Sequence, residues 1–70
     1  MMNREQILRL KIGDSVLYGD YGDTPLPVVD VSHPAWTPDG RVGRCFWLSW
    51  EGLSLPCATA EGETLYTLQE

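Results

Sequence analysis

The stretch from Arg41 to Leu55 constrains the fold of this chain more than any other part of its sequence. Large apolar side chains occupy consecutive positions from Cys45 to Leu48, so a strand with this pattern presents apolar groups on both of its faces. Glu51-Gly52 then supplies a tight turn, because glycine tolerates the positive φ that two-residue hairpin loops need. Leu53 and Leu55 resume a period of two, and the stretch therefore predicts a β-hairpin.

The turn also predicts which residues face one another across the hairpin. With Glu51-Gly52 at the tip, Phe46 opposes Cys57 and Cys45 opposes Ala58. Because neighbouring side chains of a strand alternate between faces, the cysteines fall on opposite faces and cannot form a disulfide without a bulge. Pro56 cannot donate to a strand ladder, so the second strand ends there or lies at an edge. The segment 57–63 is expected to be irregular.

The size of the chain predicts a single domain spanning residues 1–70. A chain this short buries only about 60% of the surface that its unfolded form exposes, so its core is small. The hydrophobic fraction of 43% indicates a folded protein. No apolar run approaches the roughly 20 residues that span a bilayer, and the segment 1–9 lacks the apolar core of a signal peptide. We therefore expect a cytoplasmic protein with reduced cysteines.

The net charge of −5 is distributed unevenly. The five basic residues lie near the start and on the first strand of the hairpin: Arg4, Arg9, Lys11, Arg41 and Arg44. The ranges 12–40 and 45–70 contain acidic residues but neither Lys nor Arg. A surface of this sign repels phosphate, which argues against general nucleic-acid binding. Such an acidic surface keeps the protein soluble, and it would also suit binding to a basic partner or imitation of a nucleic acid.

Shorter patterns predict the remaining elements. Asn3 can cap a short helix with Gln6 in the capping-box position, so residues 1–12 form an N-terminal helix or an extended arm. Three further strands are expected over residues 16–18, 28–33 and 64–68, separated by loops at 19–27 and 33–40. In the second of these strands, Val29 and Val31 would share one face and Val28 the other.

The run Ile12-Gly13-Asp14-Ser15-Val16 resembles the opening of SH3-like small barrels of the Tudor and KOW type. That resemblance, together with the even spacing of five short strands, implies a mainly β fold. We expect a small five-stranded SH3-like barrel with a short N-terminal helix, in which closure removes the exposed sheet edges.

Aromatic residues supply the candidate binding site. Tyr18, Tyr21, Trp36, Trp47 and Trp50 either fill the small core or form a cage that holds a methylated ammonium group, as in Tudor-like domains. Trp36 is singled out because it lies in a proline-rich loop outside any strand period, where an aromatic side chain indicates a contact surface. The predicted protein-binding patch is the following set: Trp36, Tyr21, Asp20 and Asp23.

The sequence offers little for a cofactor, a metal or catalysis. Cys45, Cys57 and His33 are too few and too widely spaced for a typical metal site. His33 precedes a proline and has no nucleophile pattern beside it. We expect no cofactor, no metal and no enzyme activity.

These observations predict a small non-catalytic binding module that acts through protein–protein contact. Its size and acidity would suit a bacterial or phage accessory protein that occupies a basic site. The alternative is a nucleic-acid-binding SH3-like module that uses Arg41, Arg44 and Lys11. A structural subunit of a larger assembly is a third class.

Overall fold

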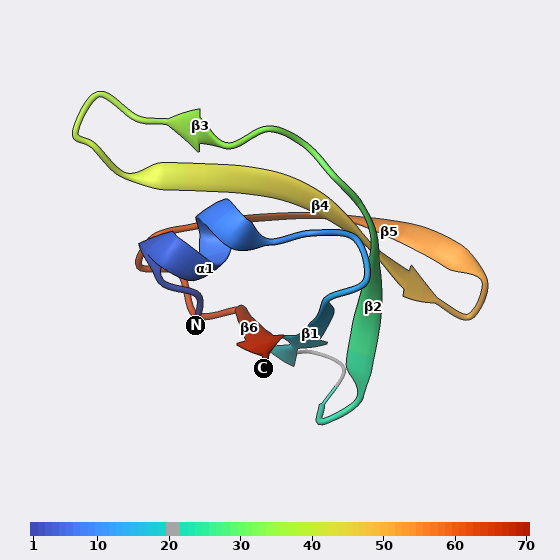
Figure 1. Cartoon of the computed structure of the whole chain (residues 1–70). Coiled ribbons are helices and arrows are strands. Elements are labelled where there is room, and N and C mark those ends of the chain that lie inside the picture. Colours follow the sequence, from blue (N-terminus) through green and yellow to red (C-terminus); the bar gives the residue numbers. More distant parts are fainter. Residues whose placement is uncertain (20–21) are drawn as a thin grey trace.

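The computed structural model describes residues 1–19 and 22–70 and is organised around one long hairpin (Figure 1). Six strands form a single antiparallel sheet, and one short helix packs against it. The elements are α1 (Arg4–Arg9), β1 (Ser15–Tyr18), β2 (Pro25–Val31), β3 (Ala35–Trp36), β4 (Val42–Trp50), β5 (Leu53–Ala60) and β6 (Tyr66–Gln69). The prediction of a mainly β fold with a short N-terminal helix is confirmed.

The β4–β5 hairpin has the predicted register. Phe46 pairs with Cys57 and Cys45 with Ala58. Glu51 and Gly52 both have positive φ, 49° and 77°, as the type I′ turn of a two-residue hairpin requires. The expectation that 57–63 is irregular was wrong for 57–60, because β5 continues past Pro56 to Ala60, and it is confirmed for 61–63. Proline is tolerated there because β5 is an edge strand, which among the described strands pairs with β4 alone.

Strand β4 is the centre of the sheet. Its other edge pairs first with β2 and then with β3, where Ala35 faces Gly43 and Trp36 faces Val42. The segment 33–40, expected to be a loop, therefore contains the short strand β3, which was not among the five predicted strands. Beyond β2 the order continues through β1 to β6. Within the described residues no pairing joins β5 to β6, so the sheet is open and a closed five-stranded barrel is not confirmed.

Strand β2 contains a bulge that sequence reasoning did not anticipate. Val28 pairs with Leu48, but the next paired residue is Asp30, which lies opposite Trp47. The extra residue is Val29, which is exposed, while Val31 packs against the core. Val28 and Val31 therefore share the core face, contrary to the prediction that Val29 and Val31 do.

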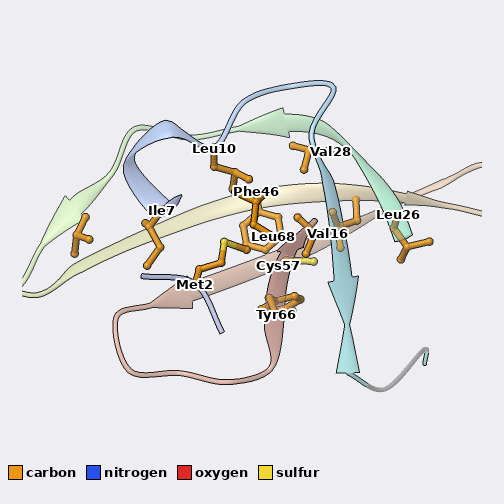
Figure 2. Close-up of a cluster of buried hydrophobic side chains, with 12 residues drawn as sticks. Met2, Ile7, Leu10, Val16, Leu26, Val28, Phe46, Cys57, Tyr66 and Leu68 are labelled. Atoms are coloured by element: carbon orange, nitrogen blue, oxygen red, sulfur yellow. The ribbon is translucent and has the colours of Figure 1, made fainter. Parts of the chain in front are cut away.

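The hydrophobic core lies between the sheet and the N-terminal segment (Figure 2). Phe46 of β4 is fully buried, and the edge of its ring meets Tyr66 of β6 at 5.1 Å between centroids. Three residues of the N-terminal segment close the core. They are Met2, Ile7 and Leu10, which are 0%, 0% and 2% exposed. The short helix is therefore part of the core.

Helix α1 is only six residues long and depends on its contacts, since a helix of that length is not stable alone. Asn3 and Gln6 form the predicted capping box at its start. At its end, Nη1 of Arg44 donates to the carbonyls of Ile7 and Leu8, both at 3.0 Å. Nε of Arg44 also donates to the carbonyl of Ser32 at 2.7 Å. One side chain of β4 thus fastens the helix to the sheet.

No helix in the ranges 1–19 and 22–70 is long and apolar enough to cross a membrane.

The hairpin turn gives a test of the fold. We expect Glu51→Asn to raise the free energy of unfolding by about 0.5 kcal/mol, because asparagine adopts positive φ more readily than glutamate. Gly52→Ala should lower it by about 1 kcal/mol, since alanine is strained at the φ of 77° while the space around Gly52 is open. Urea unfolding measures both. Equal stability of the two variants would contradict the type I′ turn.

Candidate functional site

Trp36 is the most prominent exposed aromatic side chain of the described residues. It lies on the two-residue strand β3, pairs in register with Val42, and is 54% exposed. The guanidinium carbon of Arg4 lies 5.6 Å from the centroid of its ring, which is the distance of a cation–π contact. The predicted exposure of Trp36 is confirmed, and the ring is held in place from one side.

Arg4 is itself fixed by two further contacts. Its Nε donates to Oε1 of Glu61 at 2.9 Å, and its Nη2 donates to the carbonyl of Gly40 at 3.0 Å. The same Glu61 oxygen accepts the backbone N–H of Val42 at 2.9 Å. The Arg4 hydrogen bond, followed by the Val42 N–H, lowers the pKa of the Glu61 carboxyl below its usual value. Glu61 thus links the helix to the strand that faces Trp36.

The turn after Trp36 is also ordered by hydrogen bonds. Thr37 N–H donates to the carbonyl of Arg41 at 2.8 Å, and Arg41 N–H donates to the Thr37 hydroxyl at 3.0 Å. The Thr37 hydroxyl also donates to Asp39, and this contact is the main reason that the pKa of the Asp39 carboxyl is lowered. Nε of Arg41 donates to the same carboxylate at 3.1 Å. Trp36 therefore lies on a strand that leads directly into a well-ordered turn.

The other residues of the predicted patch do not surround Trp36. Asp23 lies in the turn before β2, while Trp36 lies beyond the end of β2, and Figure 1 shows these two positions at opposite ends of the sheet. Strands β2 and β3 run in one direction along β4, and this separates the two residues. The structure therefore does not bring Asp23 next to Trp36. Asp20 and Tyr21 lie outside the described residues.

The described aromatic residues of the predicted cage do not gather around Trp36 either, and Tyr21 lies outside the described residues. The ring of Tyr18 contacts that of Tyr66 in a tilted arrangement, at 5.0 Å between centroids, and both Tyr18 and Trp50 pack against the core. Trp47 and Trp50 differ by an odd number of positions on β4, so they point to opposite faces. Among the described residues, the charged group over the Trp36 ring is Arg4, which sequence reasoning missed because the two residues are far apart in the chain.

All five basic side chains are engaged within the chain. Lys11 donates to Asp14 at 2.7 Å, and this pairing outweighs the effect of burial and lowers the pKa of the Asp14 carboxyl. Arg9 pairs with Glu5 and Glu70. Arg4, Arg41 and Arg44 make the contacts described above. Among the described carboxylates, those without an ion pair are Asp23, Asp30, Glu51 and Glu63. The excess negative charge therefore lies on carboxylates that no cation neutralises.

The role of Arg44 had a signal in the sequence. Arg44 lies two residues from Val42 and from Phe46, so it shares the core face of β4 with them. An arginine on such a face must satisfy its donors inside the protein. It therefore cannot serve the phosphate contact that was considered for it without giving up its hydrogen bonds to the helix.

The two cysteines differ in accessibility. Both are free thiols, and Cys45 is exposed whereas Cys57 is buried. Burial raises the pKa of the Cys57 thiol. His33 is exposed. In the part of the chain that the structure describes, no group of three or more His, Cys, Asp or Glu side chains could hold a metal ion.

Comparison with known proteins found no matching family model, no matching curated protein and no matching solved structure.

The reactivity of the two thiols tests whether Cys45 lies on the exposed face of the sheet and Cys57 on its core face. We expect a thiol reagent such as dithionitrobenzoate to modify Cys45 rapidly in the folded protein and Cys57 only when the protein unfolds. The Cys45→Ser variant should show almost no fast reaction, and Cys57→Ala should leave it intact. Fast modification of both thiols under native conditions would contradict the structure.

Proposed function

We propose that this protein is a small non-catalytic binding module that acts through protein–protein contact, with Trp36 at the centre of one contact surface. The observation that supports the proposal is a large aromatic side chain that is exposed and yet fixed. Trp36 is 54% exposed although Arg4 lies over its ring and the following turn is hydrogen-bonded. A tryptophan ordered before binding loses little freedom on association, and tryptophan and arginine are enriched among the residues that dominate binding energy.

The charge distribution supports a protein partner better than a nucleic acid. Arg41, Arg44 and Lys11, on which the nucleic-acid alternative depends, are each engaged by Asp39, by backbone carbonyls or by Asp14. Phosphate binding would have to break these contacts, and the net charge of −5 would oppose it. We therefore propose only the protein-binding function.

Three related expectations stay predictions. They are a cytoplasmic location, the absence of enzyme activity and an origin among bacterial or phage accessory proteins. The relationship to SH3-like domains also stays a proposal. It can be tested by comparing the strand order with that of SH3-like structures, and the order here is β5, β4, β2, β1 and β6.

The function is tested by the Trp36→Ala variant. We expect this variant to lose its partner by at least about tenfold in affinity, as at a binding hot spot. Its free energy of unfolding should fall by less than about 1.5 kcal/mol, because 54% of the side chain is already exposed. Affinity capture at low and high salt, followed by mass spectrometry, identifies the partner, and circular dichroism checks the fold.

Leu53→Ala is the matched control, because Leu53 is 61% exposed but lies at the tip of the β4–β5 hairpin. It should keep every partner that the unmodified protein captures. If Trp36→Ala also keeps every partner, the proposed contact surface is wrong. Loss of about 3–5 kcal/mol of stability in Trp36→Ala would instead assign the ring to the core.

A further inference from the structure

The face of β4 that points away from the core is unusually apolar. Val42, Phe46 and Leu48 point into the core, so positions 43, 45, 47 and 49 lie on the opposite face, and three of them, Gly43, Cys45 and Trp47, are not polar. Antiparallel sheets normally carry polar residues on a face that meets water. Trp47 is half-buried but is not among the residues that pack against the core. Strand β4 thus has an apolar face that the core does not use.

The neighbouring strands extend this apolar face. Across the ladder, Cys45 faces Ala58, Trp47 faces Pro56, and Gly43 lies between Ala35 and Ala60. These are small or apolar residues, and Ala35, Cys45, Pro56 and Ala58 are exposed. We refer to this set as the outer face: Ala35, Gly43, Cys45, Trp47, Pro56, Ala58 and Ala60.

The small side chains leave an open hollow at the end of the outer face that lies beside β3. It has a volume of about 370 Å³, and its lining includes Ala35, Gly43, Cys45, Ala58 and Ala60. Helix α1 lies on the other side of β4, where Arg44 holds it. The described part of the chain therefore leaves the hollow open. Its size and apolar floor fit the side chain of a leucine, isoleucine or valine.

The charges beside the hollow indicate what kind of partner carries that side chain. Glu63 lines the hollow, and Asp30 lies opposite Trp47 in the sheet. Neither carboxylate forms an ion pair, because all five basic side chains are engaged elsewhere. Arg44 also lines the hollow, but its guanidinium is engaged by the carbonyls of Ile7, Leu8 and Ser32. The uncompensated charge at the outer face is negative.

We propose that the outer face is a second protein-binding surface, which takes an aliphatic side chain from a segment that also carries Lys or Arg. Charge complementarity supports a basic segment over a second copy of this chain, because two copies would bring their unpaired carboxylates together. The surface is separate from Trp36, which pairs with Val42 and lies on the side of Arg4. Binding at the outer face and binding at Trp36 can therefore be tested independently of each other.

A displayed library of random 12-residue peptides, selected against the intact protein, tests this proposal. We expect the selected peptides to combine an aliphatic residue with at least two Lys or Arg residues. On titration with such a peptide, the amide resonances that shift should be those of Ala35, Gly43, Cys45, Ala58 and Ala60. Bound peptide should also slow the reaction of Cys45 with a thiol reagent.

Substitutions separate the apolar and the charged contributions. Ala58→Arg fills the hollow and adds a like charge, so it should weaken binding of the selected peptides at least about tenfold. Glu63→Gln should weaken peptide binding about threefold. Glu51→Gln is the matched control, because Glu51 also lacks an ion pair. It should leave peptide binding unchanged, since Glu51 lies at the tip of the β4–β5 hairpin, far from the hollow. Trp36→Ala should also bind normally. Circular dichroism and the midpoint of urea unfolding check that each variant is folded.

Several results would overturn the proposal. Selection of no peptide, or of peptides without basic residues, would exclude a basic segment as the occupant. Binding that survives both Ala58→Arg and Glu63→Gln but is lost in Trp36→Ala would assign recognition to the Trp36 surface alone. Sedimentation that shows a dimer, which Ala58→Arg converts to a monomer, would instead assign the outer face to a second copy of the chain.

Discussion

The fold depends on the hydrogen bonds that the guanidinium of Arg44 donates. Arg44 lies between Val42 and Phe46 on the core face of the central strand, where a charged group without partners is costly. Three backbone carbonyls solve this problem, from Ile7 and Leu8 at the end of α1 and from Ser32 after β2. The same contacts satisfy carbonyls at the end of the helix, so a helix too short to be stable alone becomes part of the core.

The docked helix accounts for the two surfaces on which the proposed functions rest. It brings Met2, Ile7 and Leu10 onto the core, and it carries Arg4 to the ring of Trp36. It covers only one side of β4, although the sequence gives that strand apolar residues on both faces. Because every cation is engaged within the chain, the unpaired charge of the molecule is acidic. A partner with basic and apolar groups complements such a surface best.

What could be predicted from the sequence was local. The register of the hairpin follows from the turn at Glu51-Gly52, and the start of the helix follows from Asn3 and Gln6, since these residues lie close together in the chain. The bulge at Val29 could not be predicted, because it depends on how β2 fits against β4. The position of Arg44 on the core face is visible in the sequence, but its contact with Ile7 spans 37 positions and that of Arg4 with Glu61 spans 57, so no sequence pattern indicates these partners. The separation of Trp36 from Asp23, two residues of the predicted patch, likewise depends on the strand pairing and not on their distance in the chain.

The most direct test is the stability of Arg44→Met, measured together with hydrogen exchange of the helix. Methionine keeps much of the apolar length but donates no hydrogen bond, so three carbonyls would lose their donor. We predict that the free energy of urea unfolding falls by about 2–3 kcal/mol. The amide of Ile7, which donates to the carbonyl of Asn3, should lose protection while the β4–β5 hairpin keeps it. Unchanged or increased stability with a protected Ile7 amide would contradict the account, because buried charged groups can be replaced without loss where apolar packing suffices.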